Sequence, residues 1–177
     1  AVSPDEKDAA RILVRNALKY QNFSGCEVVV RINPTDTEFW KEDLDAVIPL
    51  KPDMIMPTKV SGGEMIREVS AYMGQVEERS GIEKGSVKIL PLIETALGVE
   101  KAFEIASSDV RVAGLFLGGE DFTADMHCKR TKEGQEIFYA RTRLVCAARA
   151  WGIEAYDTPF TDVEDMEGLR KDTEFAK

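Results

Sequence analysis

Two apolar runs of the chain each lead into a carboxylate. Residues 87–93 run directly into Glu94, and residues 110–117 are followed four positions later by Asp121. Both runs are short, apolar and bounded by turn residues, which is typical of buried strands. A charge at the end of a buried strand is unfavourable unless something compensates it, and ligands bind at that end of parallel strands. Two such carboxylates suggest a site for a hard cation, and hence an enzyme.

The pattern alone leaves two alternatives open for these carboxylates. Each could instead form a structural ion pair with a lysine or arginine at a neighbouring strand end. In addition, Glu120 stands next to Asp121 and could be the ligand in its place. The residues therefore define a candidate metal site without deciding its membership.

Arg31 is the candidate for substrate binding, because it interrupts the apolar run 27–33. A planar guanidinium suits bidentate binding of a carboxylate. The alternative is a buried ion pair with Glu94 or Asp121, and both roles can coexist. The substrate role is the favoured interpretation.

Backbone groups near Asp121 offer a second means of binding an anion. Gly118 and Gly119 present amides that could donate to a substrate carboxylate or to an oxyanion, although a tight turn after a strand explains the same pair. Lys59 and Asp157 also follow predicted strands, and for both a structural ion pair is expected rather than direct catalysis.

Histidine and cysteine are scarce. His127 is the only histidine, and its polar surroundings favour a solvated side chain, so the sequence assigns no catalytic base. The cysteines are Cys26, Cys128 and Cys146, odd in number, far apart and without a C-x-x-C pair. This usage predicts a reduced, cytoplasmic protein without a zinc site, in which Cys26 and Cys146 are small packing residues.

Composition narrows the possible partners. The chain has 177 residues, of which 44% are hydrophobic and 31% charged, and its length suits one domain with a sizeable core. The formal net charge of −9 argues against nucleic acid and against a membrane surface as partners. No apolar run approaches the roughly 20 residues that span a bilayer, and the charged first residues do not resemble a signal peptide.

Strands and helices are predicted to alternate along the whole chain. The predicted strands are residues 27–33, 53–59, 87–93, 110–117 and 152–157. The predicted helices begin at Ser3, cover 36–48, 62–76, 98–106 and 135–150, and begin again at Thr161, with a polar loop over 123–134. Such alternation predicts parallel strands joined by right-handed crossovers.

A doubly wound sheet and a (β/α)8 barrel both fit this alternation. No G-x-G-x-x-G sequence follows the first strand, which weakens the dinucleotide-binding sheet. Every predicted strand ends in a polar residue, as in barrel enzymes that build their sites from several strand ends. A complete barrel takes about 250 residues, so we expect residues 1–177 to form one partial TIM-barrel domain with about five of eight strands, incomplete at both ends.

Seven short stretches in order carry a family resemblance. They are residues 1–7, 30–33, 57–60, 92–96, 118–122, 139–141 and 157–159. Together they resemble the citrate lyase beta-chain family, which includes citryl-, malyl- and citramalyl-thioester lyases. Residues 122–177 look especially like the beta subunit of bacterial citrate lyase.

The resemblance implies a (β/α)8 barrel that uses Mg²⁺ to cleave a 3-hydroxy-acyl thioester. It implies that Glu94 and Asp121 are the metal ligands and that Arg31 holds a substrate carboxylate. Together with Arg31, we expect Glu94, Gly118 and Gly119 to bind the substrate. It also implies that barrel strands one, two and eight, with any active-site residues they carry, lie outside this chain. The catalytic residues therefore stay unknown, and little activity is expected of these 177 residues alone.

The function implied by the resemblance is a retro-Claisen cleavage of citryl-ACP or citryl-CoA to oxaloacetate and an acetyl thioester. The alternatives are a citramalyl-CoA or malyl-CoA lyase, a pyruvate-type class II aldolase of the same superfamily, and a catalytically incomplete fragment. The implied partners are a coenzyme A or acyl-carrier-protein thioester and the other citrate lyase subunits. A homo-oligomer is expected as well, since a partial barrel exposes strand edges.

Overall fold

The computed structural model describes residues 2–177, so Ala1, the first residue of the first matching stretch, lies outside the described residues. Within residues 2–177 the strands are β1 (Val29–Ile32), β2 (Met54–Pro57), β3 (Lys88–Ile89), β4 (Leu92–Ile93), β5 (Gly114–Leu117) and β6 (Glu154–Tyr156). Every pairing between them is parallel, in the orders β1-β2-β3 and β4-β5-β6. The predicted parallel sheet is confirmed.

The strand predicted over 87–93 is divided in two. Pro91 lacks the amide that a continuous ladder needs, so β3 pairs with β2 and β4 pairs with β5. Flanking bonds hold the halves together, because Leu90 donates to the Ile55 carbonyl and Phe116 donates to that of Pro91. The prediction of one continuous strand was wrong, but the chain still delivers Glu94 to the carboxyl end of the sheet.

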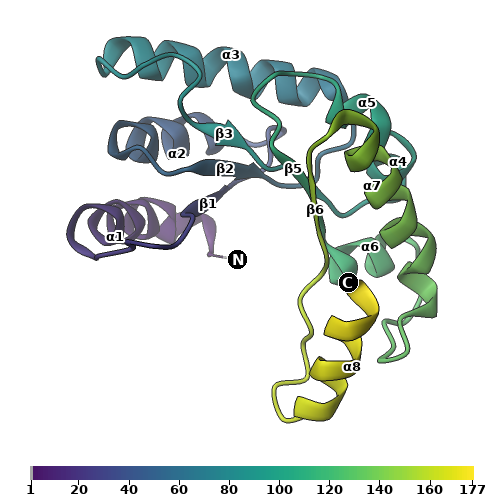
Figure 1. Cartoon of the computed structure of the whole chain (residues 1–177). Helices are drawn as coiled ribbons and strands as arrows, with labels where there is room; N and C mark the ends of the chain where they lie inside the picture. The colour runs from purple at the N-terminus through teal and green to yellow at the C-terminus, as the bar shows by residue number, and fades with distance from the viewer. Residues whose placement is uncertain (1) are drawn as a thin grey trace.

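Helices follow most strands and lie along one side of the sheet. The α-helices are α1 (Lys7–Tyr20), α2 (Trp40–Val47), α3 (Gly63–Arg79), α4 (Ala96–Glu100), α5 (Ala102–Ala106), α6 (Gly119–Asp125), α7 (Phe138–Trp151) and α8 (Met166–Ala176). Short 3₁₀ turns are η1 (Pro4–Glu6), η2 (Ile48–Leu50) and η3 (Gln135–Ile137). Figure 1 shows an open arc whose outer side is followed by helices from α1 over α3 to α7, while α8 extends beyond the sheet. This is a partial α/β barrel.

The core lies between the sheet and these helices. In β1, Val30 and Ile32 are buried in the core, whereas Val29 and Arg31 are exposed on the opposite face. The same alternation continues at the other end of the sheet, where Leu117 belongs to the core. The face that carries Arg31 is therefore the inner side of the arc.

Two helical segments that follow strands differ from the prediction. The polar loop expected from residue 123 is preceded by α6, so that the acidic residues after Gly119 stand in the first turn of a helix. The helix expected over 98–106 is divided at Lys101 into α4 and α5. Both segments are short and polar or glycine-containing, so their hydrophobic periodicity is weak.

Two further boundaries moved because local turns override the apolar pattern. Val110 was predicted to begin a strand but is 95% exposed in a turn, and β5 begins only at Gly114. The last helix was predicted from Thr161, but it begins at Met166 with Asp165 as its cap, since the Asp165 carboxylate accepts the Gly168 amide.

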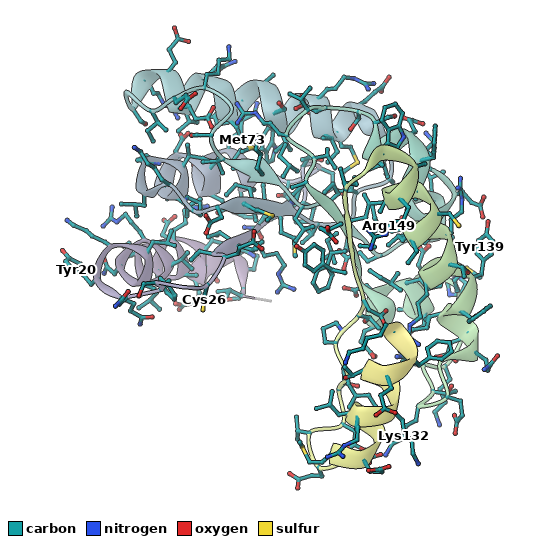
Figure 2. The ribbon with its side chains drawn as sticks, viewed as in Figure 1. Tyr20, Cys26, Met73, Lys132, Tyr139 and Arg149 are labelled. Carbon is teal, nitrogen blue, oxygen red and sulfur yellow. The ribbon has the colours of Figure 1, made fainter. Side chains whose placement is uncertain are left out.

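The prediction that Cys26 and Cys146 pack in the core was wrong. All three cysteines are free and exposed, and Figure 2 places Cys26 at the surface while Met73 lies between α3 and the sheet. The residue type alone does not predict the burial of a cysteine, because burial depends on neighbours far along the chain. Within residues 2–177, no helix combines the length and apolar character required to cross a membrane.

Candidate active site at the carboxyl ends of the strands

Glu94 is a buried carboxylate at the end of β4. It is 5% exposed, and its Oε1 accepts the Lys59 backbone amide at 2.8 Å. Gly118, at the end of β5, provides the room for it: a Cβ atom at position 118 would lie 2.7 Å from Glu94 Cβ and 2.9 Å from Oε2. The glycine is therefore required for the close approach of the two strand ends.

Asp121 is the second carboxylate of the site. It is exposed in the first turn of α6 and lies close enough to hydrogen-bond with Glu94. The neighbouring Glu120 is directed to Arg130, with 3.6 Å between Oε1 and Nε. The carboxylate that meets Glu94 is thus that of Asp121.

The electrostatic environment favours a protonated Glu94. Burial, the largest influence, and the adjacent Asp121 together raise the pKa of Glu94 to about 7, although the amide and the charge of Lys59 act in the opposite direction. A carboxyl with this pKa is half-ionised near neutral pH. The pair is therefore short of positive charge.

The carboxylates of Glu94 and Asp121 are suited to binding a hard divalent cation. Among residues 2–177, neither Glu94 nor Asp121 forms an ion pair, and no group of three or more potential ligands of the histidine, cysteine or carboxylate type occurs. Two carboxylate ligands leave the remaining coordination positions to water and substrate oxygens, which is the arrangement Mg²⁺ favours. A cation there would complete the compensation that the amide and the charge of Lys59 supply only in part.

Arg31 lies on the same face of the sheet as Glu94. Arg31 alternates with core residues of β1, just as Glu94 follows the core residue Ile93 of β4. Arg31 is exposed, and within the described residues its guanidinium forms no hydrogen bond or ion pair. The alternative of a structural ion pair with Glu94 or Asp121 is not observed, so the guanidinium is free to bind an anion.

The amides of Gly118 and Gly119 do not face a ligand as expected. The Gly118 amide donates to the Ile93 carbonyl at 2.9 Å, as part of the strand ladder, and the Gly119 amide donates to Thr158 Oγ1 at 2.9 Å. Both donors are therefore already used within the protein. The expectation of bare amides is corrected: the glycines serve by leaving space.

The two residues expected to form structural ion pairs behave differently. Asp157, at the end of β6, is paired with Arg141, as predicted. Lys59 forms no ion pair among residues 2–177; its backbone has φ of 53° and supplies its amide to Glu94. This left-handed conformation could not be predicted from the sequence, because non-glycine residues such as lysine rarely adopt a positive φ.

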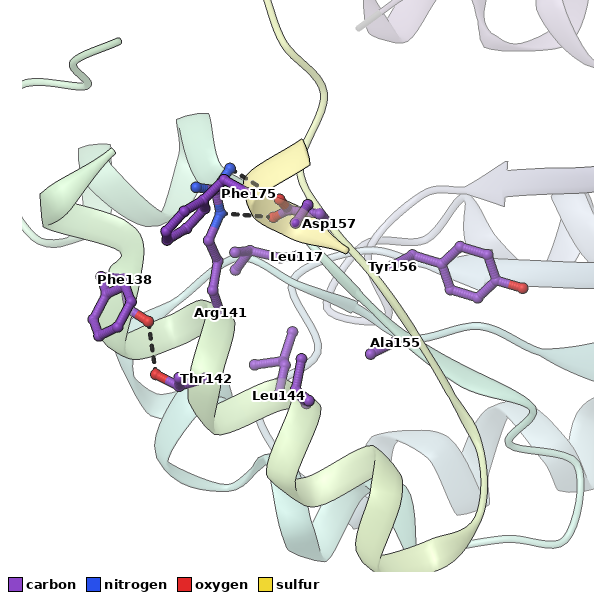
Figure 3. A pocket seen from close by; sticks show the side chains of 11 residues that line it. Leu117, Phe138, Arg141, Thr142, Leu144, Ala155, Tyr156, Asp157 and Phe175 are labelled. Carbon is purple, nitrogen blue, oxygen red and sulfur yellow. Dashed lines mark hydrogen bonds and ion pairs between the residues drawn. The ribbon is translucent and has the colours of Figure 1, made fainter. Parts of the chain in front are cut away.

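Other features lie apart from this site. A cavity of about 230 Å³ is lined by side chains of β5, α7, β6 and α8, including Leu117, Phe138 and Phe175 (Figure 3). None of Glu94, Asp121 and Arg31 lines it. His127 is exposed two residues after the end of α6 and, within the described residues, makes no side-chain hydrogen bond. No catalytic base is assigned by these positions.

Comparison with known families identifies relatives of this chain. The family described as HpcH/HpaI aldolase/citrate lyase matches residues 1–177. The chain belongs to this family. It is 42% identical to citrate lyase subunit beta of Leuconostoc mesenteroides subsp. cremoris over 174 residues, which covers 98% of the chain and 58% of that protein.

More distant members of the family are also similar. Mitochondrial citramalyl-CoA lyase of Rattus norvegicus is 29% identical over 99% of the chain and 54% of that protein. The solved structure of a citrate lyase beta subunit from M. tuberculosis, complexed with oxaloacetate and magnesium, is 27% identical with a TM-score of 0.79, over 99% of the chain and 72% of that structure. The TIM-barrel prediction is confirmed, and the chain spans little more than half the length of the two curated relatives.

Proposed function

We propose that the protein is a magnesium-dependent carbon–carbon lyase that cleaves a citryl thioester to oxaloacetate and an acetyl thioester. The observation that carries the proposal is the uncompensated carboxylate pair, Glu94 with Asp121, at strand ends on the face that carries Arg31. Membership of a family whose named relatives include citrate lyase beta subunits supports the reaction type.

Each residue has a distinct part in this proposal. Glu94 and Asp121 would hold the cation, and Lys59 fixes Glu94 through its backbone amide. When bound there, magnesium supplies Lewis-acid stabilisation of negative charge on the substrate oxygens. Arg31 binds a carboxylate of the oxo-acid half by a bidentate contact. Gly118 leaves room for these groups to approach.

The reaction is a retro-Claisen cleavage. A base, not assigned to a residue, removes the proton of the substrate's 3-hydroxyl group, and the carbon–carbon bond then breaks. Its electron pair passes to the acetyl thioester as an enolate, which takes up a proton, while the other half becomes oxaloacetate. Arg31 keeps the oxo acid oriented during this step.

A citramalyl thioester is the second candidate substrate. The 29% identity to a citramalyl-CoA lyase supports this candidate. It ranks second because the identity to a citrate lyase beta subunit is higher, at 42%. Both substrates present a 3-hydroxyl group and a carboxylate to the same cation and guanidinium. They differ in that citrate carries a carboxymethyl group where citramalate carries a methyl group, so the residues named above bind the parts that the two substrates share.

The proposed partners follow from this reaction. The substrate would be carried on coenzyme A or on an acyl carrier protein, in a homo-oligomer or with other citrate lyase subunits. The three free cysteines are consistent with a cytoplasmic location.

The decisive experiment offers the complete gene product citryl-, citramalyl- and malyl-CoA in the presence of Mg²⁺. The released oxo acid is measured through NADH oxidation by malate or lactate dehydrogenase. We expect turnover of citryl-CoA to exceed that of the other thioesters and to disappear with a chelator. Absence of turnover with all three thioesters would refute the proposal.

A matched pair of variants tests the metal assignment. Glu94→Gln should abolish the dependence on Mg²⁺ and reduce turnover by roughly two orders of magnitude or more. Glu68→Gln removes an equivalent carboxylate that is exposed on α3 and should leave turnover unchanged. If both variants behave alike, Glu94 is not a ligand.

A further inference from the structure

The turn formed by Gly118 and Gly119 is held on both sides. Glu94 lies against Gly118, and on the other side a Cβ atom at position 119 would lie 2.8 Å from Thr158 Oγ1. The Thr158 residue is buried, with 6% exposure, and its hydroxyl accepts the Gly119 amide at 2.9 Å. Because Gly119 has no side chain, the buried hydroxyl of Thr158 can approach the turn closely enough to bond with the Gly119 amide.

Thr158 is itself fixed by an ion pair. Its backbone amide donates to Asp157 Oδ1 at 2.8 Å. The Arg141 guanidinium contacts both oxygens of Asp157, with 3.0 Å from Nε to Oδ1 and 2.9 Å from Nη2 to Oδ2 (Figure 3). Arg141 Nη2 also reaches Asp172 of α8 at 2.8 Å. A chain of polar contacts therefore links α7, β6 and α8 to the first residue of α6.

This chain of contacts ends at the carboxylate pair. Gly119 is the first residue of α6, and Asp121 follows two positions later in the same helical turn. The bond to Thr158 satisfies an amide that has no partner within its own helix. Because a short helix is oriented by the position of its first turn, the Thr158 hydroxyl sets where Asp121 stands relative to Glu94.

We propose that Thr158 is a positioning residue for the cation site, acting through Gly119 on Asp121 and held in place by Asp157 and Arg141. The inference rests on the proposed magnesium site. Partners that orient metal ligands without touching the metal alter affinity by roughly 10–100-fold when they are removed. A role of this kind is separate from any contribution of Thr158 to folding.

The test is the affinity of the protein for Mn²⁺, which accepts the same oxygen ligands as Mg²⁺. Binding is followed by the loss of the free-ion signal in electron paramagnetic resonance, at a temperature at which every variant is folded. Thr158→Val keeps the shape of the side chain but leaves the Gly119 amide without an acceptor, and should weaken binding roughly 10-fold or more. Thr158→Ser restores the hydroxyl and should bind Mn²⁺ nearly as the unaltered protein does.

Thr123 provides the matched control. It is also buried, at 2% exposure, and it lies on α6, but its hydroxyl donates only to carbonyls of its own helix, those of Gly119 and Glu120. Thr123→Val should therefore lower thermal stability as Thr158→Val does, yet retain the Mn²⁺ affinity. If Thr158→Val does not fold, Asp157→Asn weakens the next link and should also reduce affinity.

The outcomes separate the two proposals. Absence of Mn²⁺ binding by the unaltered protein would overturn the proposed function and this inference together. Binding that is unchanged in Thr158→Val, or in Asp157→Asn when the former does not fold, would overturn the positioning role alone. An equal loss in Thr123→Val would also overturn it, because the effect would then follow stability.

Discussion

Two buried glutamates at opposite ends of residues 88–93 have opposite electrostatic surroundings. Glu77 approaches the start of β3 through the Gly85 and Val87 amides, whereas Glu94 follows the end of β4. Both side chains are nearly inaccessible, at 0% and 5% exposure. Since the residue type and the burial are nearly the same, the difference between Glu77 and Glu94 reports the effect of their hydrogen-bond and ion-pair partners.

Glu77 is fully compensated. The Arg111 guanidinium donates to Oε1 at 2.8 Å and to Oε2 at 2.6 Å, and the Gly85 and Val87 amides donate at 2.8 Å and 3.2 Å. Burial alone would raise the pKa of Glu77, but these bonds and the charge of Arg111 hold it below the usual value. Such a network stabilises one arrangement of strand and helix.

Glu94 has one backbone donor and another carboxylate instead. Burial and Asp121 therefore raise its pKa to about 7. Barrels commonly use the N-terminal ends of their strands for stability and the C-terminal ends for ligands. The two glutamates show the same difference within β3 and β4. Glu77, near the N-terminal end, is neutralised by Arg111, whereas Glu94, at the C-terminal end, has no ion-pair partner among residues 2–177 and could bind a cation.

The largest effect is expected from removing the charge of Glu77, the compensated glutamate. Glu77→Gln leaves the Arg111 charge buried without its partner and should lower the free energy of unfolding by about 3–5 kcal/mol, measured by urea denaturation at pH 7. The exposed neighbour variant Glu78→Gln should change it by less than about 0.5 kcal/mol. A loss similar to that of Glu78→Gln would mean that the buried pair contributes nothing.

The next effect has the opposite sign. Without divalent cations and above pH 7, Glu94→Gln should raise the free energy of unfolding by about 1–3 kcal/mol, because it removes a charge that burial disfavours. The same denaturation experiment measures it. Destabilisation by Glu94→Gln would show that the charge is compensated after all.

The pH dependence sharpens this difference. The folded pKa of Glu94, about 7, lies above its ordinary value of 4.5, so the folded state binds the proton more tightly than the unfolded state. Relative to Glu94→Gln, the cation-free protein should be most stable below about pH 4.5 and should lose stability as the pH rises to about 7. Melting temperatures of both proteins between pH 4.5 and 8 measure this, and a constant difference would contradict the raised pKa.

Two glycine substitutions give the smaller effects. A Cβ at Gly118 meets Glu94 Cβ at 2.7 Å, so Gly118→Ala should cost about 1–2 kcal/mol and weaken Mn²⁺ binding. A Cβ at Gly74, one turn before Glu77 in α3, meets the mobile end of Lys84 at 2.8 Å. Gly74→Ala should stay within about 1 kcal/mol of the unaltered protein, because helix propensity offsets the contact. Equal losses would contradict the special role of Gly118.

Much of this arrangement could be predicted from residue patterns. The apolar runs before Glu94 and Asp121 identified the strand ends, and the polar residue after each strand favoured a barrel. The division at Pro91 was also readable, since proline interrupts a ladder, but the apolar run on both sides concealed it. The helix α6 was missed because a segment of seven residues, three of them acidic, has little hydrophobic periodicity.

Other parts of the site had no local signal. The left-handed backbone of Lys59 and the buried hydroxyl of Thr158 act through contacts that no residue pattern announces. The amides of Gly118 and Gly119 were expected to face a ligand, but their donors are used by Ile93 and Thr158. Such bonds depend on which segments meet in the folded chain.

By itself, the sequence determined the alternation of strands and helices and the residue types at the strand ends, because hydrophobic period and turn residues are local properties. Only the tertiary structure decided how each charge is compensated. Glu77 meets Arg111 across 34 positions, and Glu94 meets Lys59 across 35. Burial and hydrogen bonding are set by such distant neighbours, so two identical side chains became a structural ion pair at one end of the sheet and a candidate cation site at the other.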